Sequence, residues 1–143
     1  MATLPQPFQA TPELRAALEG IATPQSVEPN TVLFRQGEAV KGVYIVFEGK
    51  VRLSLSGLDF LDSRVAEPGS ILGLPAAMCN KPYSLTAETI EKARVGFVEH
   101  ERMLDFLRSQ PSLCYQVLEM LAEEVREMRR TGAHALAAQM PVN

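Results

Sequence analysis

The chain has 143 residues, of which 46% are hydrophobic and 22% charged, as is ordinary for a soluble globular domain with a real core. Its net charge of −3 argues against the basic surface of a dedicated nucleic-acid-binding domain. No apolar run approaches the ~18 residues that cross a bilayer, and the N-terminus lacks the basic start and apolar core of a signal peptide. We therefore expect one cytoplasmic domain over residues 1–143, with no membrane partner.

The first predicted element is a helix over residues 11–20. Thr11 suits the N-cap, and Pro12 suits the first helical position, where a backbone N–H is not needed. Gly20 is expected to end this helix.

Short apolar strands separated by glycines are expected over residues 27–98. Residues 50–56 alternate between apolar and polar side chains, which is typical of a half-buried strand. The apolar set of that strand is Val51, Leu53 and Leu55. Gly49 lies where two strands would meet, and Pro68-Gly69 marks a turn. The segment predicts a small antiparallel β-barrel or roll.

Two helices are predicted after the strands, within residues 100–131. A short helix over 100–107 is followed by a long helix that begins near Pro111. Gly132 is a plausible stop for the long helix, because glycine is common just past helix ends. Residues 132–143 are then expected to form a tail.

The long helix carries two apolar seams. The first seam steps by four and three residues, as a heptad pattern does: Cys114, Leu118, Leu121, Val125 and Met128. The second seam consists of Leu113, Val117 and Met120. A helix with two apolar faces can pack on its own barrel and on a second copy at once. We predict a homodimer interface formed by Leu118, Leu121, Val125 and Met128, whereas the alternative is that both seams pack into one core.

The order of strands, short helix and long helix resembles that of the cyclic-nucleotide-binding domain, most closely the sensor domain of Crp/Fnr transcriptional regulators. The motifs that carry the resemblance are Leu33-Phe34-x-x-Gly37-Glu38, Tyr44-x-Val46-x-x-Gly49-x-Val51-x-Leu53 and Pro68-Gly69-x-x-x-Gly73. The resemblance implies a mainly β fold with flanking helices: a double-stranded β-helix, or jelly-roll, barrel with a long C-terminal helix of the dimerisation type.

In that family the ligand is held by a cassette inside the barrel. The resemblance implies a Gly-Glu pair at a short helical turn, followed some residues later by Arg-Ser/Thr-Ala. Backbone N–H groups at the glycine and helix start favour a phosphate, and the arginine neutralises its charge. The glutamate accepts the ribose hydroxyl.

This sequence departs from the family cassette at its charged positions. Gly73 and Ser84 match, but Leu74 stands where glutamate is expected and Tyr83 where arginine is expected. Leu85 replaces the small alanine. The candidate ligand-binding cassette is Gly73, Leu74, Pro75, Ala76, Ala77, Tyr83, Ser84 and Leu85. A phosphate buried here would lack a compensating charge, so cyclic-nucleotide binding is expected to be altered or lost.

Two basic residues were considered as substitute charges for the cassette. Lys81 is interpreted as a solvated turn residue, and Arg94 lies in a strand where either face is open to it. A less charged small-molecule effector, or no ligand, is also consistent with this apolar cassette.

Other chemistries find little support in the sequence. The two histidines, His100 and His134, lie far apart, so no metal site is predicted. Cys79 and His100 are interpreted as structural rather than as haem ligands, and two cysteines cannot hold an iron–sulfur cluster. No nucleophile–base pair stands out, so neither catalysis nor a cofactor is expected.

Only 12 residues follow Thr131 (143 − 131), too few for a helix-turn-helix. We therefore expect no direct nucleic-acid binding, in either a natural single-domain protein or a sensor domain cut from a longer regulator. The leading hypothesis is a non-catalytic, dimeric regulatory module. The alternative is a structural protein-interaction module with no small-molecule ligand.

Overall fold

Two antiparallel four-stranded sheets form the body of the molecule, with strand orders β1-β8-β3-β6 and β2-β7-β4-β5. The computed structural model describes residues 8–55 and 63–139, and from residue 131 only the backbone. The strands are β1 (Thr23–Val27), β2 (Val32–Phe34), β3 (Gly42–Glu48), β4 (Val51–Ser54), β5 (Arg64–Ala66), β6 (Ile71–Leu72), β7 (Thr86–Thr89) and β8 (Ala93–Glu99). The predicted jelly-roll class is confirmed.

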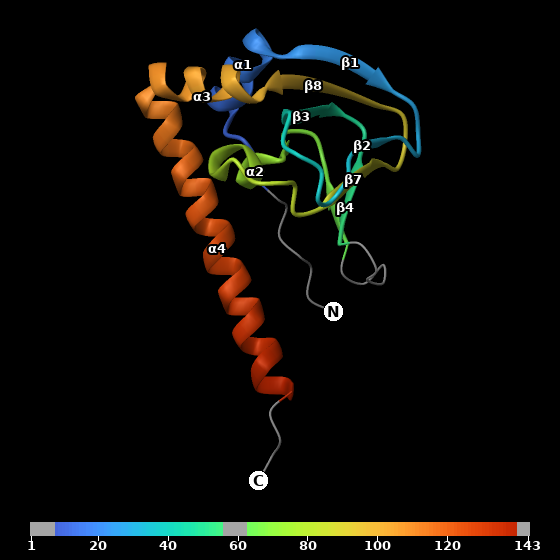
Figure 1. The fold of residues 1–143 in the computed structure, drawn as a ribbon, viewed down its shortest axis with the longest axis vertical. Helices are drawn as coiled ribbons and strands as arrows, with labels where there is room; N and C mark the ends of the chain where they lie inside the picture. The colour runs from blue at the N-terminus through green and yellow to red at the C-terminus, as the bar shows by residue number, and fades with distance from the viewer. Residues whose placement is uncertain (1–7, 56–62, 140–143) are drawn as a thin grey trace.

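Four helices flank the sheets: α1 (Pro12–Ile21), α2 (Leu74–Cys79), α3 (His100–Ser109) and α4 (Pro111–Gln139). Helices α1 and α3 lie at one end of the barrel, and α4 runs from that end along and beyond it (Figure 1). The Thr11 side chain caps α1 as predicted, by accepting a hydrogen bond of 3.1 Å from the Leu14 N–H. The helix passes Gly20 and ends one residue later, at Ile21.

The predicted strand boundaries differ from the observed ones at two places. The first strand begins at Thr23, earlier than residue 27, because its backbone pairs with β8 while its first four side chains are exposed and show no apolar alternation. Strand β4 ends at Ser54, where its pairing with β7 stops, and Leu55 is exposed. The last predicted position of that strand, residue 56, lies outside the described residues.

Gly49 makes the tight connection between β3 and β4. Its φ of +90° lies in the left-handed region, which glycine enters without strain. A Cβ placed there would come within 2.6 Å of the Lys92 carbonyl oxygen, so the position also excludes any side chain for lack of room. The turn predicted at Gly49 is confirmed.

The predicted end of the long helix at Gly132 is wrong. The backbone of α4 remains helical through Gly132 to Gln139. Glycine in a helix interior costs about 1 kcal/mol relative to alanine, which is not enough to end a helix that continues into Ala-rich sequence. The predicted tail over residues 132–143 is therefore helical as far as residue 139.

The core divides into a helix-side cluster and a barrel cluster. The helix-side cluster packs one face of β3 and β8 against the helices. Its helical members with buried side chains are Leu14 and Leu18 of α1, Leu74 and Ala77 of α2, Met103 and Leu107 of α3, and Leu113 and Val117 of α4. The barrel cluster combines side chains from both sheets, among them Val46, Val51, Leu53, Leu72 and Ala87. The second predicted seam of the long helix therefore packs on its own barrel, as expected.

Candidate functional site

The candidate cassette begins at Gly73, which precedes α2. Gly73 has a φ of +86°, and its carbonyl oxygen accepts a hydrogen bond of 3.1 Å from the Ala77 N–H. A Cβ at Gly73 would lie 2.9 Å from Cε1 of Tyr83 and 3.3 Å from the Gly42 carbonyl oxygen. The glycine is therefore required both by its backbone conformation and by the close approach of the Tyr83 ring.

Tyr83 fills the space beside Gly73. Its side chain is only 3% exposed, and its ring stacks on Phe34 with centroids 4.0 Å apart and planes 13° apart. The hydroxyl donates a hydrogen bond of 2.7 Å to the Gly42 carbonyl oxygen. It also accepts hydrogen bonds from the N–H groups of Lys41 (3.1 Å) and Gly42 (3.2 Å). The position where the family resemblance implies an arginine thus holds an aromatic side chain whose polar atom is fully engaged.

The remaining cassette residues do not converge on one space. Leu74 and Ala77 are buried in the helix-side cluster, whereas Ala76 is buried with Tyr83 in the barrel cluster. Leu74, where the resemblance implies a ribose contact, thus packs in a different cluster from Tyr83, where it implies a phosphate contact. This division follows from α2 lying between the two clusters, which the linear sequence does not reveal.

The other three predicted positions lie towards the surface. Ser84 is exposed, Pro75 is half-buried, and Leu85 is half-buried against the barrel cluster. The matching family position at Ser84 therefore faces away from the buried part of the cassette.

Neither basic residue considered as a substitute charge enters the cassette. Lys81 is exposed, as predicted. The Arg94 guanidinium lies outside the barrel, 4.8 Å from the centroid of the Phe47 ring and 3.7 Å from a Glu48 carboxylate oxygen. The cassette thus contains no cationic side chain among its described residues.

A row of aromatic rings extends from Tyr83 through Phe34 of β2 to Tyr44 of β3 and Phe97 of β8, and so involves both sheets. Phe34 stacks on Tyr83, and its centroid is 6.1 Å from that of Tyr44, which in turn lies 5.1 Å from Phe97. Burial raises the pKa of the Tyr44 phenol above its ordinary value, and the nearby Tyr83 and Glu38 add to the effect. The phenol is therefore held neutral in the fold to a higher pH than in the unfolded chain.

The residues weighed as metal or haem ligands have structural settings. The Nε2 atom of His100 lies 2.8 Å from the Ala77 carbonyl oxygen, which ties α3 to α2. Cys79 is exposed, Cys114 is half-buried, and both are free thiols. Over the described ranges 8–55 and 63–139, no group of three or more His, Cys, Asp or Glu residues could hold a metal ion.

The predicted dimer seam is split by the structure. Leu118, Val125 and Met128 are 53%, 48% and 63% exposed. Leu121 instead packs partly buried against the helix-side cluster of its own chain, as does Cys114. Leu121 therefore contacts the core of its own chain, and its predicted place in a dimer interface stays a prediction. Tyr115, which is not part of either predicted seam, is also an exposed large hydrophobic residue of α4.

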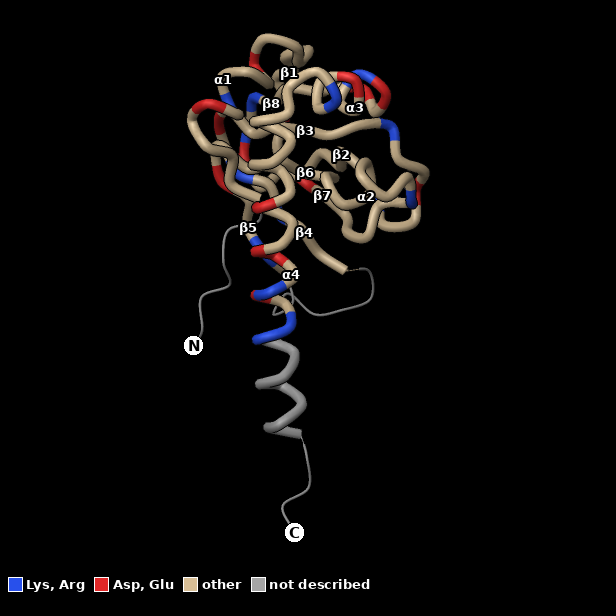
Figure 2. Tube along the Cα trace, turned by 90° about the vertical axis from the view of Figure 1, so that its left-hand side faces the viewer, with Lys and Arg blue, Asp and Glu red and all other residues tan. Residues whose placement is uncertain are grey.

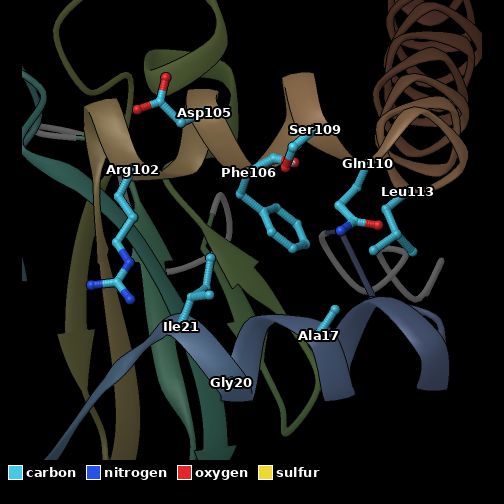
Figure 3. A pocket seen from close by; sticks show the side chains of 9 residues that line it. All are labelled: Ala17, Gly20, Ile21, Arg102, Asp105, Phe106, Ser109, Gln110 and Leu113. Atoms are coloured by element: carbon cyan, nitrogen blue, oxygen red, sulfur yellow. Dashed lines mark hydrogen bonds between the residues drawn. The ribbon is translucent and has the colours of Figure 1, made fainter.

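An open hollow of about 660 Å³ lies between α1, α3 and the start of α4. Phe106 and Gln110 point into it above Ala17 and Ile21, while Arg102 extends beside Ile21 (Figure 3). The hollow shares no residue with the cassette. Asp105, which lines the hollow, pairs with Arg108 of the same helix at 3.0 Å. The lining mixes polar and apolar side chains, and we assign no function to it.

Two long-range contacts were missed by sequence reasoning. The partners of Tyr83, namely Phe34 and the Gly42 backbone, lie more than 40 residues away in the chain. Arg64 of β5 pairs with Glu124 of α4 at 2.6 Å, across 60 residues. No local pattern signals either contact, because both depend on which distant elements the barrel brings together.

The sequence model described as "Cyclic nucleotide-binding domain" matches residues 24–110. Among curated proteins, the chain is 24% identical over 121 residues to the "Anaerobic regulatory protein" of Bacillus subtilis, covering 82% of this chain and 50% of that protein. It is 22% identical over 132 residues to the "CRP-like cAMP-activated global transcriptional regulator" of Mycobacterium tuberculosis, covering 91% of this chain and 59% of that protein. The chain thus spans between half and three fifths of the length of these relatives.

The fold is shared with solved structures. The catabolite activator protein of Thermus thermophilus superposes with a TM-score of 0.74 at 22% identity, covering 89% of this chain and 60% of that one. Within the described residues, no helix is both long enough and apolar enough to cross a membrane.

Proposed function

This chain belongs to the cyclic nucleotide-binding domain family, in the form found in Crp/Fnr-type regulators, and from this we propose a non-catalytic, dimeric regulatory module with lost or altered cyclic-nucleotide binding. The observation that carries the proposal is the position of Tyr83. Its buried ring packs against the cassette glycine, and its hydroxyl already satisfies the Gly42 backbone. We also propose that the domain extends over residues 1–143 and that the protein is cytoplasmic.

A bound cyclic nucleotide would bring a phosphate charge into this cassette. The described cassette offers no cation to neutralise that charge, and the Tyr83 hydroxyl donates to Gly42 instead. Burying an unpaired charge costs several kcal/mol, on the order of the whole stability of a small domain. Activation by cAMP, which the name of the mycobacterial relative states for that protein, is therefore not proposed for this one.

The dimer part of the proposal rests on the exposed face of α4. Leu118, Val125 and Met128 present apolar side chains along one helix, and such a stripe is stabilised when a second helix covers it. The neighbouring face of α4 is occupied by its own barrel through Leu113 and Val117. The homodimer is thus proposed mainly through Leu118, Val125 and Met128, because Leu121 is partly covered by its own chain.

The second candidate is a structural interaction module that binds no small molecule. The same Tyr83 contacts favour it, because the hydroxyl and ring already make the interactions that a ligand would otherwise supply. The two candidates differ in whether the protein binds a small molecule.

Calorimetric titration of the intact chain with cAMP and cGMP tests the proposal, and micromolar or tighter binding of either would refute the cassette argument. Native mass spectrometry of the purified protein reports subunit count and any co-purified molecule together. A defined bound molecule would support an altered effector over the interaction module. A monomer at all concentrations would remove the dimer from the proposal.

A further inference from the structure

One ion pair joins the barrel to the long helix at a point far from where the helix begins. Nη1 of Arg64, on β5, lies 2.6 Å from Oε1 of Glu124, on α4. The two side chains are only 19% and 11% exposed. Figure 2 shows α4 passing beside β5 on its way out of the domain.

The other ion pairs of the described residues differ in kind. Three of them join residues three positions apart on the same helix, and all three include at least one strongly exposed side chain. The fourth, Arg94–Glu48, has a longer contact of 3.7 Å and is exposed. Surface pairs of this type contribute little to stability. The Arg64–Glu124 pair is thus the one partly buried pair found here that links a strand to a helix.

This contact lies far enough along α4 to constrain the direction of the helix. Glu124 lies 13 residues after Pro111, or about 20 Å along the helix at 1.5 Å per residue. Leu113 and Val117 anchor the first part of α4 in the core, and Met120 and Leu121 pack partly buried against the same cluster. Because apolar contacts are non-directional, a charged hydrogen bond far along the helix constrains its angle and rotation more than they do.

The rotation of α4 also decides where its exposed apolar residues point. Val125 follows Glu124 in the chain and lies about 100° further round the helix. When Glu124 is held against Arg64, Val125 and Leu118 are turned away from the barrel, and both are exposed. A rotation that broke the pair would carry these side chains to another direction.

We infer that the Arg64–Glu124 ion pair fixes the direction and rotation of α4, and so sets how the Leu118–Val125 face meets a second copy. This inference rests on the proposed dimer for its second half only. A partly buried pair suits the role, because removing one partner leaves an uncompensated charge while replacing both can be neutral, so such pairs specify geometry more than they add stability.

Spin-label distance measurements test the first half directly. Labels are placed at Glu28→Cys and Arg129→Cys in a Cys79→Ser/Cys114→Ala background, diluted with unlabelled protein so that only distances within one chain are read. We expect one narrow distance distribution. Arg64→Gln and Glu124→Gln should broaden or shift it, and the reversed pair Arg64→Glu/Glu124→Arg should restore it. Glu123→Gln, which breaks the exposed pair one position earlier, is the matched control.

Sedimentation of the same variants tests the second half. The single variants should weaken dimerisation by about tenfold or more, and the reversed pair should recover it. Unchanged distances in both single variants would overturn the inference, and changed distances with unchanged dimerisation would overturn its second half. If the single variants fail to fold, the reversed pair alone decides, because it must then both fold and show the original distance. A monomeric wild-type protein would defeat the proposed dimer while the distances still judge the ion pair.

Discussion

The hydroxyl of Tyr83 hydrogen bonds to both the carbonyl oxygen and the N–H of Gly42, at 2.7 Å and 3.2 Å. This pairing joins the segment after α2 to the start of β3. It also uses the polar atom of the side chain at the position where the family resemblance implies a phosphate contact. The relationship makes Tyr83 a structural element of the barrel, and its consequences can be measured.

Tyr83→Phe is expected to destabilise the fold by about 1–3 kcal/mol, because it leaves the buried Gly42 N–H and C=O groups and the Lys41 N–H short of a partner. Urea denaturation measures the change in the free energy of unfolding. Tyr115→Phe is the matched control, since that side chain is exposed, and it should change stability by less than about 0.5 kcal/mol. Equal effects of the two substitutions would show that the Tyr83 hydrogen bonds add nothing.

Gly73→Ala is expected to destabilise the protein by about 1–3 kcal/mol, because its φ of +86° is strained for alanine and the new Cβ meets Tyr83. Part of this loss should disappear in a Tyr83→Ala background, where the ring is gone, and a double-mutant cycle by urea denaturation measures that part. Gly20→Ala provides the control, since a Cβ there meets nothing within 4 Å and the position is helical. Gly20→Ala should stabilise α1 slightly. A Gly73→Ala variant that is more stable than the wild-type protein would contradict the expected steric conflict between the new Cβ and Tyr83.

Leu118→Glu is expected to dissociate the proposed dimer without lowering the stability of the monomer, because the side chain is exposed in the single chain. Leu121→Glu should instead lower the melting temperature, since Leu121 packs on the core of its own chain. Sedimentation equilibrium and thermal unfolding separate the two effects. Arg130→Glu, which reverses an exposed charge on the same helix and breaks its pair with Glu127, is the control for a change of charge away from the apolar face. A dimer that survives Leu118→Glu would rule out this face of α4.

Tyr44→Phe is expected to alter the response of stability to alkaline pH. Because burial raises the pKa of the folded Tyr44 phenol, the unfolded chain loses this proton first, at its ordinary pKa of about 10. The stability that this group contributes is present below that pH and is lost as pH rises through the folded pKa. The free energy of unfolding should fall more steeply above about pH 10 in the wild-type protein than in Tyr44→Phe. Parallel curves from urea denaturation across that range would argue against a raised pKa of the half-buried Tyr44 phenol.

Much of the fold was predictable because its signals are local. The cap at Thr11, the glycine between β3 and β4, and the alternation of Val51 and Leu53 each depend on a few neighbouring residues. Prediction was wrong where local preference was weak. Gly132 did not end α4, since one glycine costs less than the surrounding helix formers supply. The first strand was predicted to begin too late, at residue 27, because the exposed side chains of β1 show no apolar alternation.

The cassette is a proposal from the sequence, which does not indicate how its residues are arranged in space. The substitutions at Leu74 and Tyr83 are visible in the sequence, and they predict that the phosphate contacts are lost. Only the structure places Leu74 in the helix-side cluster and Tyr83 in the barrel cluster, because α2 lies between two cores.

The sequence by itself determined the jelly-roll class, the family and the absence of charged residues at the cassette positions, because spacing and residue type are sufficient for these. The tertiary structure decided that Tyr83 closes on Gly42, that Leu121 belongs to the core while Leu118 is exposed, and that Arg64 holds Glu124. The physical reason is that these contacts join residues far apart in the chain. A residue's partner, unlike its helical or strand preference, is set only when the whole barrel has packed.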